Sequence, residues 1–95
     1  MTYRSEKLRR LVASLPCANC GAPAPSQAAH SNLGCHGKGM ALKASDAAIF
    51  PLCPECHREF DQGKTYTKQE RCHLTHEMIA STYIQLIESG LLEPT

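Results

Sequence analysis

The sequence predicts a small α+β domain that needs more than a hydrophobic core to hold it together. The chain has 95 residues, which is enough for one domain. Aromatic side chains are scarce, with three Tyr, two Phe and no Trp, so the core that they can build is modest. Six cysteines are the third observation, because small domains often depend on a disulfide framework or a metal site for stability.

Residues 3–15 predict an N-terminal helix with one apolar face. The apolar and basic residues alternate at three- and four-residue spacing, with Leu8, Leu11, Val12 and Leu15 on one face and Arg4, Lys7, Arg9 and Arg10 on the other. Pro16 ends the helix. We expect its basic residues to form the outer surface.

Two short strands and a helix are expected in the middle of the chain. Residues 27–31 predict the first strand, and the glycines over residues 32–46 predict a loop without regular structure. The apolar, partly β-branched run at residues 47–53 predicts a buried strand. A helix over residues 54–62 follows, since proline suits its first position and Gly63 suits its end.

A long C-terminal helix is predicted within residues 67–90. Thr67 is the expected N-cap, and Glu70 three residues later completes a capping box. The helix should run to about Ser89, with Gly90 as the first residue beyond its cap. We expect it to pack on the domain through an apolar stripe of Met78, Ile79, Tyr83, Leu86 and Ile87.

The N-terminal segment indicates the redox compartment. Residues 1–16 contain no continuous apolar run and no small-residue cleavage site of a secretory signal, and no stretch approaches the roughly 20 apolar residues of a membrane span. We therefore expect a cytoplasmic protein whose thiols stay reduced, and this favours metal binding over disulfides.

Four of the cysteines have the spacing of a zinc site. Cys17 and Cys20 form one C-x2-C pair, and Cys53 and Cys56 form a second. Each pair can hold one ion from a single turn, and two such turns complete a tetrahedral site of four thiolates. The sequence therefore predicts a structural Zn2+ that ties distant parts of the chain together.

A four-cysteine site needs no histidine, so His57, directly after Cys56, is left for another role. On a helix His57 and Asp61 lie on one face, where an imidazole and a carboxylate can begin a second divalent-ion site. The spacing also fits a His57 that caps or packs locally and an Asp61 that is merely a surface acid.

The remaining Cys and His residues give weaker signals. Cys72 and His76 stand four apart on the last helix and can bind a metal, but packing and surface roles are favoured because no second pair accompanies them. The same reading holds for His73. Cys35 and His36 lie in the glycine-rich loop, where a direct role in metal or substrate binding is the less favoured reading.

Charge is distributed unevenly along the chain. Residues 1–68 carry nine Lys or Arg against five acids, a balance of +4, whereas residues 69–95 carry one Arg against four Glu, a balance of −3. A mildly basic front part permits contact with nucleic acid, and an ordinary solvated surface explains it equally well.

The ordered set "AAH … GKGMALKASD … PLCPECHREFD" resembles the HNH, or ββα-metal, nuclease family. It is most similar to small HNH nucleases encoded by phages and prophages, some of them linked to recombination. The resemblance covers residues 17–62 and rests on several motifs in order: a histidine after a strand, a glycine and lysine loop that ends in an acid, a strand, C-x2-C, a histidine and a helix. It implies a ββα-metal core that holds one catalytic ion beside DNA.

The resemblance also implies roles for single residues. His30 matches the general base, and Asp46 stands where the family often has an asparagine that orients the base or the loop. His57 matches the last histidine, a metal ligand, and Asp61 takes the place of a further ligand on the helix. Many members have an acidic ligand at the position of Ala29, so here His57 and Asp61 would hold Mg2+ or Mn2+ with water and substrate.

The sequence thus predicts a metal-dependent endonuclease that hydrolyses DNA phosphodiester bonds in phage or prophage DNA metabolism. We expect a single HNH-like domain over residues 1–95, with a zinc-bound core at 17–62. DNA is the expected partner, no membrane is expected, and phosphate contacts are expected from Lys38, Lys43 and Arg58. The alternative is a catalytically inactive, zinc-stabilised module that binds DNA or another protein.

Overall fold

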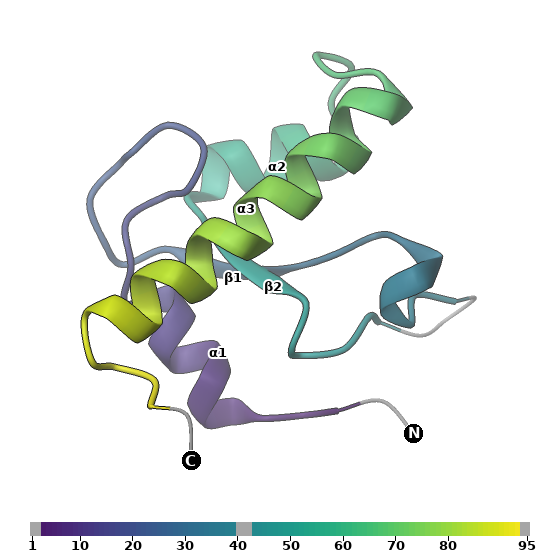
Figure 1. The fold of residues 1–95 in the computed structure, drawn as a ribbon. Helices are drawn as coiled ribbons and strands as arrows, with labels where there is room; N and C mark the ends of the chain where they lie inside the picture. Colours follow the sequence, from purple (N-terminus) through teal and green to yellow (C-terminus); the bar gives the residue numbers. More distant parts are fainter. Residues whose placement is uncertain (1–2, 40–42, 94–95) are drawn as a thin grey trace.

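The protein is described by a computed structural model that covers residues 3–39 and 43–93. Helices and a two-stranded sheet confirm the predicted α+β class (Figure 1). The elements in chain order are α1 (Glu6–Ala13), β1 (Gln27–His30), the 3-10 turn η1 (Gly34–His36), β2 (Ile49–Leu52), α2 (Pro54–Gln62) and α3 (Lys68–Glu88). Residues 40–42, which belong to the predicted glycine-rich loop, lie outside the described residues.

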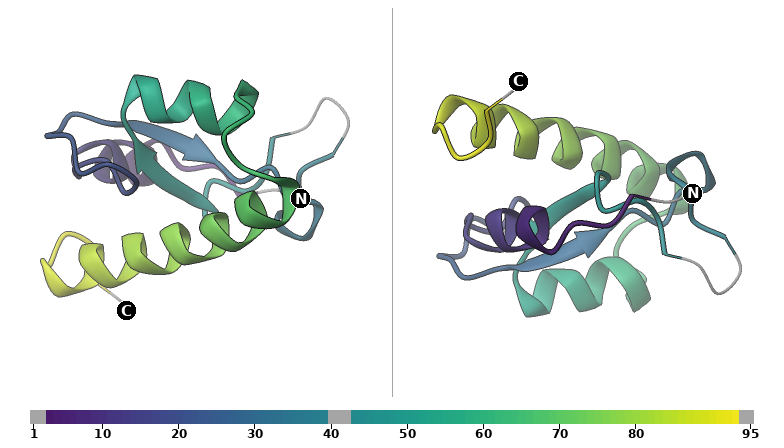
Figure 2. Two further views of the ribbon diagram at one scale, coloured as in Figure 1. Left: turned by 90° about the horizontal axis from the view of Figure 1, so that it is seen from above. Right: turned by 90° about the horizontal axis from the view of Figure 1, so that it is seen from below.

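The two strands form an antiparallel pair in which His30 lies opposite Ile49 and Gln27 lies opposite Leu52. Figure 2 shows α3 along one side of this sheet and α2 on the other, with α1 packed beside the strands. Helices therefore cover both faces of β2, and all four of its residues are buried. This explains why the sequence of β2 is continuously apolar rather than alternating.

The core has two parts that meet at β2. One part joins the first cysteine turn to the sheet, α2 and α3 through Cys17, Ala29, Phe50, Leu52, Phe60 and Met78. The other joins α1 to the strand and the end of α3 through Leu8, Val12, Leu15, Ile49 and Leu86. The small number of aromatic side chains is concentrated in the first part, where the rings of Phe50 and Phe60 meet edge to face at 5.9 Å between centroids.

Helix α1 is shorter than the predicted range of residues 3–15. Ser5 is its N-cap, with a hydroxyl that accepts the backbone N–H of Leu8 at 3.1 Å, so residues 3 and 4 stay extended. The predicted apolar face is confirmed, since Leu8 and Val12 are buried. The side chains of Arg4 and Arg9 reach the surface, at 43% and 38% exposed, and their guanidinium groups also turn toward the buried Asp46, a contact that the sequence did not predict.

The strands are shorter than predicted, and the loop between them is partly regular. Gly34–His36 form one 3-10 turn where the sequence indicated none. The turn forms because the Ser31 hydroxyl accepts the N–H of Leu33 at 3.0 Å before it begins, and Gly37 ends it at a φ of 92°.

The predicted limits of α2 and α3 agree closely with the structure. Helix α2 has proline at its first position and Gly63 as its C-cap. Helix α3 begins with the predicted capping box of Thr67 and Glu70. Beyond its C-cap, Gly90 has a φ of 77° and donates to the carbonyl of Ile87, while Leu91 donates to Leu86, which is the Schellman arrangement.

The buried stripe of α3 differs from the predicted one. Ile87 is 48% exposed, and two threonines are buried in the stripe together with Met78 and Leu86. Thr75 and Thr82 fill these positions because their hydroxyls donate to the carbonyls of Arg71 and Met78 in the preceding turn, at 2.7 and 2.6 Å. An apolar count along the sequence does not reveal this, since hydroxyls satisfied within the helix can be buried at little cost.

No helix among the described residues has the length and apolar character required to cross a bilayer.

We expect Leu86→Ala to lower the free energy of unfolding by about 2–5 kcal/mol, because Leu86 is fully buried between α1 and β2. Ile84→Ala is the matched control on the same helix, since Ile84 is 57% exposed and its truncation should change stability by less than about 0.5 kcal/mol. Urea denaturation measures both. Equal effects of the two substitutions would contradict the packing described for α3.

Candidate functional site

The four predicted zinc ligands come together at one corner of the domain. Cys17 and Cys20 lie in the turn after α1, and Cys53 and Cys56 lie at the start of α2. Their sulfur atoms all lie within 4.8 Å of one another. The cluster therefore joins two segments that are far apart in the sequence, as the two C-x2-C pairs predicted.

Local backbone geometry forms each half of the cluster. The Sγ atoms of Cys17 and Cys53 accept the N–H groups of Cys20 and Cys56, each at 3.5 Å, so each pair closes a tight turn. Cys53 is also the N-cap of α2. Gly21 closes the first turn at a φ of 78°, a conformation that side chains disfavour.

Electrostatics explains why this cluster suits a cation. Burial opposes ionisation of the Cys17 thiol, but nearby backbone N–H groups outweigh it and lower the pKa of Cys17 to about 6. Burial, together with the neighbouring thiols, raises the pKa of Cys56 to about 12. The four thiols cannot all ionise side by side without a positive charge among them. A metal ion such as zinc supplies that charge, and the four cysteines are placed to hold one.

His30, at the end of β1, contacts the carboxylate of Asp46 directly. The Nε2 atom of His30 lies 2.7 Å from Oδ1 of Asp46. Asp46 is only 1% exposed, whereas the His30 side chain is 18% exposed. A buried carboxylate thus holds a partly accessible imidazole, as in sites where an acid orients a histidine base.

Asp46 is surrounded by donors. The backbone N–H of Ser5 donates to its Oδ2 at 2.7 Å, Arg9 contacts the same oxygen, and Arg4 contacts Oδ1 at 3.3 Å. Burial alone would raise the pKa of Asp46, but hydrogen bonds from His30, Ser5 and Arg9 lower it to about 2. Because the carboxylate is ionised and can only accept, Nε2 of His30 carries a proton, and in the neutral ring Nδ1 keeps its lone pair.

His57 and Asp61 face each other across one turn of α2. Nε2 of His57 lies 3.3 Å from Oδ2 of Asp61, and Nδ1 lies 2.7 Å from the side-chain oxygen of Gln27. The amide oxygen only accepts, so Nδ1 carries a proton and Nε2 of the neutral ring directs a lone pair toward a carboxylate. With the ring in this tautomer, a cation between the two facing acceptor atoms, either a proton on the ring or a metal ion, would stabilise the pair.

One cavity joins the two histidine–aspartate pairs. It has a volume of about 430 Å³, and its lining includes His30, His57, Asp61, Arg9, Ser31, Asn32, Lys38 and Lys43. A smaller hollow of about 300 Å³ shares His57 and Asp61 and adds Arg58. Of the three predicted phosphate contacts, Lys38 and Lys43 thus line the same cavity as His57 and Asp61, and Arg58 lines the neighbouring hollow.

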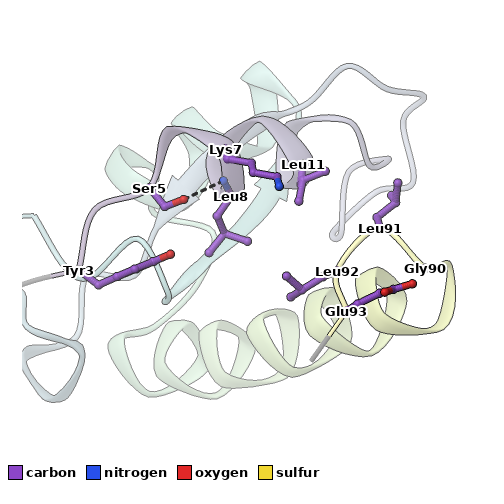
Figure 3. A pocket seen from close by; sticks show the side chains of 9 residues that line it. All are labelled: Tyr3, Ser5, Lys7, Leu8, Leu11, Gly90, Leu91, Leu92 and Glu93. Carbon is purple, nitrogen blue, oxygen red and sulfur yellow. Dashed lines mark hydrogen bonds between the residues drawn. The ribbon is translucent and has the colours of Figure 1, made fainter. Parts of the chain in front are cut away.

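A second cavity of similar size lacks this chemistry. It has a volume of about 450 Å³ and lies between α1 and the turn after α3. Figure 3 shows Leu8 and Leu11 of α1 on one side and Leu91 and Leu92 on the other, with Tyr3 at its edge. Among the described residues, its lining includes no histidine or cysteine.

Several residues that build the site were not predicted from the sequence. Arg4 and Arg9 read as outer helix residues, because nothing in the sequence shows that Asp46 packs against α1. Gln27 and Asn32 read as ordinary polar residues, yet Gln27 contacts His57, and Asn32 donates to Asp61 at 3.3 Å. The burial of Ala29 could have been predicted, because neighbouring side chains on a strand point to opposite faces. Ala29 is 2% exposed and lies in the core, on the opposite face of β1 from His30.

The fold and site define a small α+β protein with a four-cysteine cluster and a basic cavity lined by histidines. Residues 1–85 match the model of a family described as "Protein of unknown function (DUF968)", so the chain belongs to that family. It is also 46% identical over 55 residues to "Uncharacterized protein YdfU" of Escherichia coli (strain K12). That match covers 57% of this chain and 15% of the relative, so the chain spans a small part of that protein's length. No solved structure matches the chain at a significant level.

We expect the buried charge of Asp46 to make stability depend on pH. Because its pKa falls from an ordinary 3.8 to about 2, ionised Asp46 stabilises the fold above about pH 4, and this contribution is lost as the pH falls through 2. A pKa shift of this size corresponds to on the order of 2 kcal/mol in the free energy of unfolding. The gap in free energy of unfolding between the native chain and Asp46→Asn should therefore narrow from pH 4 to pH 2.

Denaturant titrations at several pH values measure this gap. Ile84→Ala is the control, because Ile84 is 57% exposed and its removal changes no titratable group, so its gap should stay constant over the same window. A gap for Asp46→Asn that stayed constant over the window would contradict an ionised, buried Asp46.

Proposed function

We propose that this protein is a metal-dependent nuclease of the HNH type, stabilised by zinc on its four cysteines, that hydrolyses phosphodiester bonds in DNA. One observation carries the proposal: His30, His57 and Asp61 line one cavity together with Arg9, Lys38 and Lys43. A general base, a pair of metal-ligating groups and a set of phosphate-binding cations thus share one space.

His30 is suited to act as the base through Nδ1. Asp46 fixes the ring through Nε2 at 2.7 Å and stabilises the charge that the ring gains when it takes a proton. A neutral imidazole held in this way can accept that proton from water. The water oxygen attacks phosphorus as its proton passes to Nδ1, and the leaving oxygen departs on the opposite side.

His57 and Asp61 are suited to hold Mg2+ or Mn2+. Their facing acceptor atoms at 3.3 Å fit a cation, and Gln27 fixes the ring so that Nε2 is the ligating nitrogen. The bound ion would stabilise charge on the scissile phosphate and on the leaving oxygen. With Ala29 buried in the core, water and phosphate oxygens would complete the coordination sphere.

The basic residues around the cavity support an anionic substrate. Arg9, Lys38 and Lys43 line the cavity itself, and Arg58 lies beside His57 and Asp61 in the adjoining hollow. Cations around one cavity can contact backbone phosphates, which fixes the register of a strand without reading its sequence. DNA is the partner we propose, in phage or prophage DNA metabolism.

The four-cysteine cluster would act structurally. A site closed by four thiolates leaves no open position for substrate. Its contribution to stability would be large. Structural zinc sites in small peptides have apparent binding free energies of roughly 10–16 kcal/mol. A whole domain has a free energy of unfolding of about 5–15 kcal/mol.

We expect Cys17→Ser, or removal of zinc with a strong chelator, to abolish cooperative thermal unfolding as followed by circular dichroism. Cys72→Ser is the matched control, because Cys72 lies on α3 outside this cluster. Its melt should resemble that of the native chain. A native-like melt for Cys17→Ser with zinc absent would rule out the structural role.

We expect purified protein to cleave DNA only when Mg2+ or Mn2+ is added. Duplex, single-stranded and branched DNA form the test panel. His30→Ala should reduce the cleavage rate by about 10²–10⁴-fold, the usual contribution of a general base. His73→Ala is the matched control, because His73 is an exposed histidine on α3 that pairs with Glu77.

Two outcomes would contradict the proposal. Equal cleavage by His30→Ala and the native chain would remove His30 from the mechanism. Metal-independent binding of DNA without cleavage of any substrate in the panel would favour the alternative, a zinc-stabilised module without catalysis.

A further inference from the structure

A second cluster of metal-ligating side chains lies apart from both sites described above. Cys35, His36 and His76 each offer a ligand atom, and these atoms all lie within 4.8 Å of one another. Among residues 3–39 and 43–93, this cluster and the four-cysteine cluster are the groups with such spacing. It contains neither of the histidines assigned to the proposed nuclease site.

The fold brings these residues together from two directions. Cys35 and His36 are neighbours in η1, and His76 lies on α3. The rings of His36 and His76 meet nearly edge to face, with centroids 5.1 Å apart and planes at 76°. The sequence suggested Cys72 as the partner of His76, but Cys72 is not in the cluster. It lines a separate hollow with Leu33 and Thr75.

His36 is held in an orientation that suits a metal ligand. Its Nδ1 lies 2.7 Å from the hydroxyl of Ser31, which is 1% exposed and also accepts the N–H of Leu33. This contact leaves Nε2 as the ring nitrogen available to an ion. Ligating histidines usually make such a hydrogen bond through their other nitrogen, because it fixes the ring and the tautomer.

We propose that Cys35, His36 and His76 form a second metal site, selective for Zn2+ and chemically similar ions, with a fourth coordination position open to solvent. The set of one thiolate and two imidazoles favours zinc and related transition metals over Mg2+ or Ca2+, which prefer oxygen ligands. Metal sites with three protein ligands and one open position bind water or an exogenous ligand at that position. Cys35 and His76 are exposed, so solvent reaches the site.

Occupation of this site would fix η1, the turn that follows β1. An ion there would link η1 to α3, which are otherwise joined at this point by the contact between two rings. Ser31 and Lys38 flank the ligands in sequence and line the proposed nuclease cavity. Metal binding would therefore stabilise part of the cavity wall, whether or not the cavity hydrolyses DNA.

The test is a titration with Co2+, in the absence of DNA, of protein that carries a single equivalent of Zn2+, which the four cysteines hold. We expect a second equivalent to bind, with the charge-transfer band of a thiolate ligand and the visible bands of four-coordinate Co2+. His76→Ala should weaken this binding by more than the roughly 10–100-fold that loss of an outer-shell partner costs. Total metal content after dialysis gives an independent measure of stoichiometry.

Three control variants make the assignment specific. His73→Ala removes an exposed histidine from the same helix, and Cys72→Ser removes a thiol that lies outside the cluster. Both should bind the second equivalent as the native chain does. His57→Ala should also keep it, which separates this site from the His57–Asp61 pair.

The proposal would be overturned if the native chain bound one equivalent of metal in total, Zn2+ and Co2+ together, or if His76→Ala still bound a second equivalent with the thiolate band. A second equivalent without a thiolate band would likewise overturn it, since Cys35 would not be a ligand. None of these results depends on cleavage of DNA, so failure here is distinguishable from failure of the proposed nuclease function.

Discussion

The buried carboxylate of Asp46 is the interaction on which the geometry of the cavity depends. It contacts the N-terminal end of α1 through Ser5 and two arginines, and it holds His30 at the end of β1. A charge that is 1% exposed is costly to bury unless donors surround it, and here the donors come from separate parts of the chain. Arg4 extends the link by donating to the carbonyls of Lys43 and Ala44, at 3.0 and 2.6 Å. Helix, loop and strand are thus joined at one polar point beside the cavity that His30, His57 and Asp61 line.

Much of the fold was predictable because local rules and tertiary packing agree. Proline at the start of α2 and the capping box of α3 satisfy backbone groups within a few residues, so their signals are complete in the sequence. The two C-x2-C pairs were equally informative, because each closes its own turn. The spacing of His57 and Asp61 also translated directly into proximity, since one helical turn separates them.

The remainder depends on long-range contacts that no local pattern encodes. Arg9 lies 37 positions from Asp46, and its role follows only from the way α1 packs beside the strands. The buried threonines of α3 depend on hydrogen bonds within the helix that an apolar pattern overlooks. The cluster of Cys35, His36 and His76 depends on where η1 meets α3. Adjacent residues on a loop have no defined partner until the tertiary fold supplies one.

Helix α2 carries both kinds of site within nine residues. Cys53 and Cys56 occupy its first turn, and His57 and Asp61 follow along an axis that advances about 1.5 Å per residue. Because the helix is short, a tilt at the end that carries Cys53 and Cys56 would displace the imidazole of His57. The position of His57 therefore depends on how firmly the cysteines fix the start of α2. Natural variants of this domain should accordingly change the two halves of the helix in concert rather than one at a time.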